Sequence, residues 1–126
     1  AQENLKSLNR LTFSFPPDHG AAVVELILTN SSMEEKWKTE LEEMRDRMLN
    51  LRRNLSASLK RETNSDRFDF IKNHRGMFSR LGLSEKNVEQ LRNDFAIYMV
   101  ADSRINIAGL QSEKIDILAA SVAKII

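Results

Sequence analysis

The chain has 126 residues, 41% of them hydrophobic, which is enough to bury one core of ordinary domain size. Its 19 Lys and Arg residues nearly balance 18 Asp and Glu residues, so the net charge of +1 indicates neither a nucleic acid nor an anionic membrane as a partner. The absence of cysteine excludes disulfides and thiol nucleophiles, and no apolar run is long enough to span a bilayer. We therefore expect a soluble, cytoplasmic protein.

The first thirty residues combine an extended segment with an apolar helix. Residues 11–15 precede Pro16 and Pro17, which disfavour helix before them, so we expect this segment to be extended. Residues 21–28 predict a helix with apolar side chains on nearly every face. Such a helix needs cover on all sides, and the remaining sequence has little apolar surface to spare. We expect this region to pack against material outside the chain.

A long amphipathic helix is predicted over residues 32–61, beginning at an S-x-x-E capping box formed by Ser32 and Glu35. At ~1.5 Å per residue it would be about 45 Å long, wider than a small domain, so we expect it to connect two bodies. Apolar residues recur three and four positions apart along it, a pattern typical of core lining, with a partner-binding groove as the alternative. These residues are Met33, Trp37, Leu41, Met44, Met48, Leu51, Leu55 and Leu59.

The rest of the chain predicts short strands interleaved with helices. Residues 68–71 and 76–79 favour extended structure, and the chain is expected to turn at Gly82. Ser84 is a suitable cap for a helix that carries Val88, Leu91 and Phe95 on one face. Two β-rich runs, 97–100 and 104–108, flank an Ala-Asp-Ser turn, and a final helix is expected over 112–126. This order predicts an α/β, α+β-like small domain in which helices cover a short sheet, a class that hosts many functions.

Four motifs carry a resemblance to a known family. They are RLTFSFPPDHGAAVV from Arg10, EEMRDRMLNLR from Glu42, NHRGMFSRLGLS from Asn73 and SRINIAGL from Ser103. Their order and spacing resemble the C-terminal part of the aspartate and aromatic amino acid aminotransferases, class I enzymes of fold type I that use pyridoxal phosphate. The resemblance implies that residues 1–30 end the large domain and include an interface loop. It implies that residues 31–62 form the long interdomain helix and residues 63–126 the small C-terminal domain.

The resemblance assigns Arg104 to the substrate's α-carboxylate, since this residue occupies the arginine position of the family's R-[IV]-N-[VI]-A-G motif. An amino acid and a 2-oxo acid share this carboxylate, and a guanidinium fork binds it through two parallel hydrogen bonds that lysine cannot reproduce. The alternative is a structural arginine in a surface ion pair, for which Asp102 is the nearest candidate partner.

Three further residues are singled out by the resemblance. Arg10 corresponds to the residue that crosses the dimer interface to bind the side-chain carboxylate of a dicarboxylic substrate in the neighbouring site, and Ser14 lies in the same interface loop. Phe78 matches a ring that lines the substrate pocket, with an ordinary core residue as the alternative. His19 is given no catalytic role, and no residue here is expected to bind a metal.

The chain departs from the family pattern near the expected site. Asp102 and Ser103 stand where family members often have Ser-Gly, which brings an acid close to Arg104 and removes a glycine's backbone freedom. Arg80 stands where an aromatic residue is common, and Phe15 replaces a common Asn or Ser. An Asp102 carboxylate paired with Arg104 would compete with substrate.

The resemblance implies a pyridoxal phosphate-dependent homodimeric enzyme that transfers an amino group between aspartate or aromatic amino acids and a 2-oxo acid such as 2-oxoglutarate. In this family the Schiff-base lysine and the phosphate cup lie upstream of residue 1, so the chain by itself is expected to be inactive and to bind no cofactor covalently. The alternative is a non-enzymatic, self-associating interaction module derived from a truncated aminotransferase.

Overall fold

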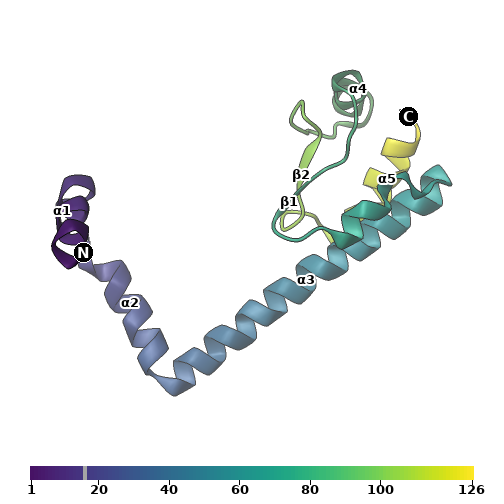
Figure 1. Ribbon diagram of the computed structural model, residues 1–126. Coiled ribbons are helices and arrows are strands. Elements are labelled where there is room, and N and C mark those ends of the chain that lie inside the picture. The colour runs from purple at the N-terminus through teal and green to yellow at the C-terminus, as the bar shows by residue number, and fades with distance from the viewer. Residues whose placement is uncertain (16) are drawn as a thin grey trace. The chain divides into compact units, whose positions relative to one another are not determined.

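The computed structural model describes residues 1–15 and 17–126, which form two compact units, Ala1–Glu42 and Glu43–Ile126. The boundary between the units falls within the longest helix, α3 (Ser31–Thr63; Figure 1). The expected division at residues 30 and 62 concerns the domains of a larger protein and stays a prediction.

The first unit contains α1 (Gln2–Thr12), α2 (Asp18–Thr29) and the beginning of α3. The expected helix over 21–28 is confirmed within α2, but the extended segment expected over 11–15 is wrong. Its first two residues belong to α1, and the backbone N–H groups of Phe13 and Ser14 still donate to Asn9 and Arg10. Proline restricts mainly the residue directly before it, so Pro16, itself outside the described residues, does not prevent a helix four residues upstream.

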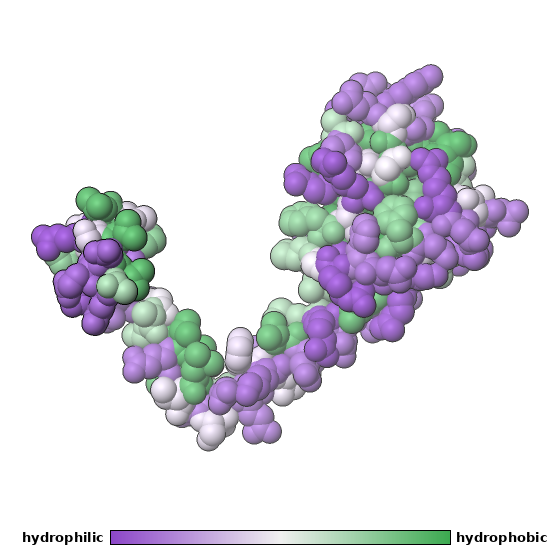
Figure 2. Space-filling view, in the orientation of Figure 1, coloured by the Kyte–Doolittle hydropathy of each residue, from purple (hydrophilic) through white to green (hydrophobic). Residues whose placement is uncertain are grey.

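The apolar side chains of the first unit are exposed. No residue among 1–15 and 17–42 is buried, and Figure 2 shows hydrophobic side chains on the surface of α1 and α2. The large exposed ones on these helices and the segment between them are Leu5, Leu8, Leu11, Phe13, Phe15, Val23, Val24, Leu26 and Leu28. The expectation that further material covers this region stays a prediction.

Helix α3 confirms the predicted long helix, with two corrections. The cap is Asn30 and not Ser32, because the Asn30 side-chain oxygen accepts from the backbone N–H of Met33 at 3.1 Å. Asn caps a helix as well as Ser does, and it occupies the earlier position. The apolar stripe lines a core only in its C-terminal part, where Leu51, Leu55 and Leu59 are buried, whereas Met33, Trp37, Leu41 and Met44 are exposed.

The second unit packs short elements around the C-terminal half of α3. They are η1 (Asp66–Asn73), β1 (Phe78–Arg80), α4 (Glu85–Phe95), β2 (Arg104–Asn106), η2 (Ser112–Lys114) and α5 (Ile115–Ala123). Strands β1 and β2 pair antiparallel, which confirms a short sheet accompanied by helices. The shared core draws on α3, η1, α4, β2, α5 and the segments between them, and comprises Leu51, Leu55, Leu59, Phe68, Ile71, Leu81, Leu83, Val88, Leu91, Met99, Ile105, Ile107, Ile115, Leu118, Ala119 and Val122.

Two predicted strands are not formed. Residues 68–71 lie in the 3₁₀ helix η1, where Phe68 and Ile71 are both buried. Their spacing of three is the period of a 3₁₀ helix, and a period-2 interpretation missed it. Residues 97–100 form no strand because they serve the ends of other elements: Ile97 N–H donates to Leu91 O after α4, and Val100 O accepts from Ser103 N–H.

A buried arginine joins α3 to the segment before the sheet. Arg52 is 1% exposed, and its Nη1 donates to Ser79 Oγ at 2.6 Å and to Ile71 O at 3.4 Å. Its Nη2 donates to the backbone oxygens of Gly76 and Phe78 at 2.7 and 3.2 Å. Burial, and secondarily the charge of Arg75, lowers the pKa of Arg52. All four of these acceptors are neutral, and they satisfy the N–H donors of a buried cation. The same hydrogen bonds hold the backbone of β1 against α3.

We expect Arg52→Ala to lower the free energy of unfolding of the full chain by about 2 to 4 kcal/mol, because it leaves buried oxygens without donors and opens a cavity. The matched control is Arg53→Ala, since the neighbouring Arg53 is exposed and donates to Asn50 one turn away on the same helix. We expect the control to change stability by less than about 0.5 kcal/mol. Urea denaturation measures both, and equal losses would contradict the role given to Arg52.

Candidate functional site

The strand pair presents one face to the core and one to the outside. Phe78 pairs with Asn106, Ser79 with Ile105 and Arg80 with Arg104, and successive side chains of a strand alternate between faces. Ser79 and Ile105 are buried, whereas the other four side chains lie on the exposed face. The expected site residues Phe78 and Arg104 are thereby brought to the same face of adjacent strands.

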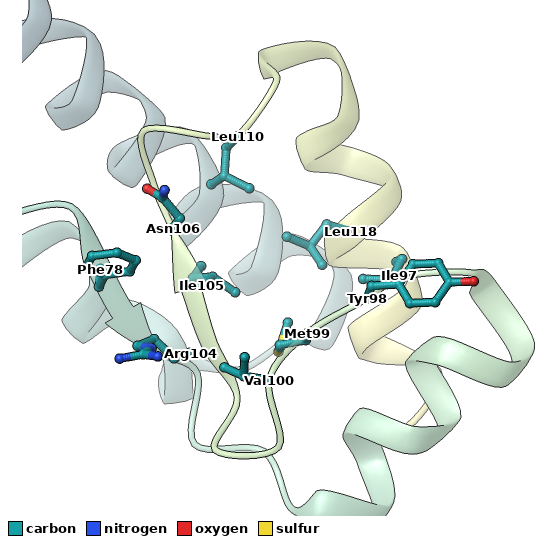
Figure 3. A pocket seen from close by; sticks show the side chains of 10 residues that line it. All are labelled: Phe78, Ile97, Tyr98, Met99, Val100, Arg104, Ile105, Asn106, Leu110 and Leu118. Atoms are coloured by element: carbon teal, nitrogen blue, oxygen red, sulfur yellow. The ribbon is translucent and has the colours of Figure 1, made fainter.

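A groove of about 370 Å³ adjoins this sheet. Figure 3 shows Phe78 and Arg104 on one side of it and the segment 97–100 with Leu118 on the other. Among the described residues that line it, Arg104 is the charged one and most others are apolar. The lining residues are Phe78, Ile97, Tyr98, Met99, Val100, Arg104, Ile105, Asn106, Leu110 and Leu118. An apolar groove with a single cation suits an organic acid with an apolar body.

The guanidinium of Arg104 lies over an aromatic ring, with its Cζ atom 5.4 Å from the centroid of Phe78. This is cation–π distance, which orients the guanidinium without occupying its N–H donors. Within residues 1–15 and 17–126, the Arg104 side chain has no hydrogen bond or ion pair. Phe78 is 51% exposed and lies outside the buried core of the second unit, and its role as a pocket residue stays a prediction.

Asp102 pairs with Arg80 and not with the Arg104 side chain. Its Oδ2 accepts from Arg80 Nε at 3.0 Å and from Arg80 Nη2 at 2.7 Å, and its Oδ1 accepts from the backbone N–H of Arg104 at 3.1 Å. The Arg80 hydrogen bond is the main cause that holds the pKa of Asp102 below its usual value, with smaller contributions from the backbone hydrogen bond of Arg104 and from the positive charges of Arg80 and Arg104. The structural ion pair considered for Arg104 is therefore absent from the described residues.

Ser103 occupies a backbone conformation that glycine would favour, with a φ of 58°. Its side chain is buried, and its Oγ accepts from the backbone N–H groups of Gly82 and Leu83 at 3.0 and 3.2 Å. Its backbone oxygen also accepts from Leu81 N–H at 3.0 Å. The hydroxyl thus ties the residue before Arg104 to the chain that leaves β1, and this offsets the cost of the left-handed conformation.

We expect both Ser103→Ala and Ser103→Gly to destabilise the chain, because each removes the acceptor for two backbone N–H groups. The alanine variant should lose roughly 1 to 3 kcal/mol, and the glycine variant roughly 1 kcal/mol less, because glycine adopts a positive φ without strain. Urea denaturation should give a free energy of unfolding that falls from wild type to Ser103→Gly to Ser103→Ala. An alanine variant as stable as wild type would show that the hydroxyl contributes nothing, because alanine keeps the strained φ and removes only the Oγ atom.

The other expected site residues lie in the first unit. Arg10 is in the last turn of α1, Ser14 follows it with a φ of 60°, and His19 begins α2; all three are exposed. They belong to the unit Ala1–Glu42, whereas the groove lies in the unit Glu43–Ile126, and their roles stay predictions. Sequence reasoning missed the Arg80–Asp102 pair, although the signal was there: two departures from the family pattern carry opposite charges.

The chemistry of the side chains present does not fit a complete pyridoxal phosphate site. All lysines are exposed, and none lines the groove beside Arg104, so the groove offers no amine for a Schiff base. No group of three or more His, Asp or Glu side chains among residues 1–15 and 17–126 is arranged to hold a metal ion. None of the helices in these described residues has the length and apolarity needed to cross a membrane.

The chain belongs to the class I and II aminotransferases, since the model of that family matches residues 2–122. It is 48% identical to the aromatic-amino-acid aminotransferase of Paracoccus denitrificans over 99% of this chain and 32% of that protein. It is 38% identical to the aspartate aminotransferase of Haemophilus influenzae over 97% of this chain and 31% of the relative. The chain therefore spans about a third of the length of these relatives.

Solved structures agree with this assignment. The aromatic-amino-acid aminotransferase of Burkholderia pseudomallei, covalently bound to pyridoxal phosphate, superimposes with a TM-score of 0.90 at 39% identity. The match covers 98% of this chain and 31% of that one. A second structure, an aromatic amino acid aminotransferase with 3-indolebutyric acid, gives a TM-score of 0.88 at 49% identity over 94% of this chain and 30% of that one. The fold is thus that of a segment of a fold type I aminotransferase.

Proposed function

We propose that this chain supplies the substrate-carboxylate side of the active site in a pyridoxal phosphate-dependent aminotransferase. The enzyme would transfer an amino group between aromatic amino acids or aspartate and a 2-oxo acid such as 2-oxoglutarate. The observation that carries the proposal is the guanidinium of Arg104 at the edge of an apolar groove, where it has no hydrogen-bonded partner among residues 1–15 and 17–126. The names of the relatives, aromatic and aspartate aminotransferases, support the choice of substrates.

Arg104 binds the α-carboxylate common to every substrate of this reaction. The Phe78 ring orients the guanidinium, and two N–H groups donate to the two carboxylate oxygens in a bidentate pair. The apolar lining excludes water from around the carboxylate, which strengthens this pair. Bound pyridoxal phosphate supplies the electron sink for the chemistry, and the reactive lysine comes from a segment outside this chain.

Arg10 and Ser14 serve the site of a partner subunit in this proposal. Arg10 is an exposed cation at the end of α1, and the exposed apolar side chains of α1 and α2 favour association with further protein surface. In a homodimer, Arg10 would bind the second carboxylate of a dicarboxylic substrate. An aromatic substrate has no such group, so the contribution of Arg10 depends on the substrate.

The alternative function is a non-enzymatic interaction module derived from a truncated aminotransferase. Such a module would have the same exposed apolar helices, so self-association of the chain does not distinguish it from a segment of an enzyme. The discriminating observation is a coding segment upstream of Ala1 that contains a Schiff-base lysine. Its presence supports the aminotransferase, and a start codon directly before Ala1 supports the interaction module.

In the intact enzyme, we expect Arg104→Lys to lower kcat/KM about 10- to 1000-fold for aspartate, phenylalanine and 2-oxoglutarate alike. Lysine keeps the charge but loses the bidentate geometry, and all three substrates present the same carboxylate. Cofactor absorbance should be unchanged. Steady-state kinetics measure the effect, with Arg92→Lys on the exposed face of α4 as the matched control.

The pattern across substrates distinguishes the two arginines. Arg10→Lys should impair aspartate and 2-oxoglutarate more than phenylalanine, because only the first two have a second carboxylate. If Arg104→Lys changed kcat/KM by less than about twofold for every substrate, carboxylate binding by Arg104 would be refuted.

A further inference from the structure

The register of the sheet places two arginines directly opposite each other. Arg80 on β1 and Arg104 on β2 are cross-strand partners on the exposed face. Like charges in this position repel each other, so each guanidinium needs its own stabilising contact. Arg80 is bonded to Asp102, and Arg104 lies over Phe78. Among the described residues, the Arg80 guanidinium therefore has a carboxylate partner, whereas the N–H donors of Arg104 can still bind a ligand.

Asp102 lies within reach of both cations. It is two residues from Arg104 and already accepts that residue's backbone N–H at Oδ1. Its Oδ2 receives two donors from Arg80, and its side chain keeps 35% of its surface exposed. While Arg80 is in place, Oδ2 therefore accepts two N–H groups and Oδ1 accepts one. Without Arg80, Oδ2 would lie free beside the Arg104 guanidinium, on the same chain and at high effective concentration.

We propose that Arg80 is a positioning residue that holds Asp102 away from the Arg104 side chain and so keeps an internal carboxylate from competing with substrate. This inference rests on the proposed role of Arg104. The physical basis is competition: a guanidinium paired with Asp102 for part of the time binds substrate with an apparent affinity reduced by that fraction. The competition acts before the reaction begins, so it weakens substrate binding without changing the chemical step.

The test is a double-mutant cycle in the intact holoenzyme with Arg80→Leu, Asp102→Asn and the double variant. We expect Arg80→Leu to raise KM for both phenylalanine and 2-oxoglutarate about two- to fivefold with kcat unchanged, the range typical of partly exposed ion pairs. Asp102→Asn alone should not raise KM, because the amide carries no charge. In the double variant KM should return towards the wild-type value, so that the two changes are non-additive.

Two further variants serve as controls. Arg80→Lys keeps a cation beside Asp102, so its KM should lie between those of wild type and Arg80→Leu. Arg92→Leu removes one positive charge from exposed α4 and should leave KM unchanged, which controls for net charge. Thermal unfolding and cofactor absorbance report whether each variant is folded and loaded.

Three outcomes would overturn the inference: an unchanged KM in Arg80→Leu, an equal rise in Asp102→Asn alone, or a rise that the second substitution does not reverse. The kinetics of Arg104→Lys separate this failure from failure of the proposed function. If Arg104→Lys impairs all substrates and Arg80→Leu impairs none, only the positioning role falls. If Arg104→Lys impairs none, the carboxylate site itself is wrong.

Discussion

The buried Arg52 guanidinium is the contact on which the geometry of the second unit depends. Four donors from one side chain meet the backbone of Ile71, Gly76 and Phe78 and the hydroxyl of Ser79. A sheet of two short strands is marginal by itself, so β1 requires this attachment to α3. Because Ser79 faces the guanidinium, alternation turns Phe78 to the opposite, exposed face, where it meets Arg104. A polar interaction in the core thus orients an aromatic ring at the groove.

The electrostatics of the exposed face follow from this arrangement. One acid, Asp102, lies close to two cations, and its hydrogen bonds go to the side chain of Arg80 and the backbone of Arg104. The Arg104 guanidinium remains unpaired among the described residues, beside side chains that are mostly apolar. This arrangement suits a carboxylate site, since a ligand must find the guanidinium donors without a hydrogen-bonded partner. Arg80 and Asp102, two of the departures from the family pattern near this site, form an ion pair with each other.

Much of the fold was predictable because its signals are local. Helix α3, the Ser84 cap of α4 and the strands around Phe78 and Arg104 all follow from periodicity and capping residues. Other features were not predicted. Phe68 and Ile71 have a spacing that a strand cannot use and a 3₁₀ helix can, and the β-rich run 97–100 is occupied by hydrogen bonds at its ends. The pairing of Arg80 with Asp102, 22 residues apart, depends on strand register, which composition and periodicity do not specify.

A crystal structure of the intact holoenzyme with 3-phenylpropionic acid, a substrate-like carboxylic acid that cannot react, would show directly which side chain binds the carboxylate. We expect two hydrogen bonds of about 2.7 to 2.9 Å from the Arg104 guanidinium to the carboxylate, the phenyl ring in the apolar groove, and the Arg80–Asp102 pair intact. A complex in which another cation holds the carboxylate, while Arg104 pairs with Asp102, would contradict this expectation.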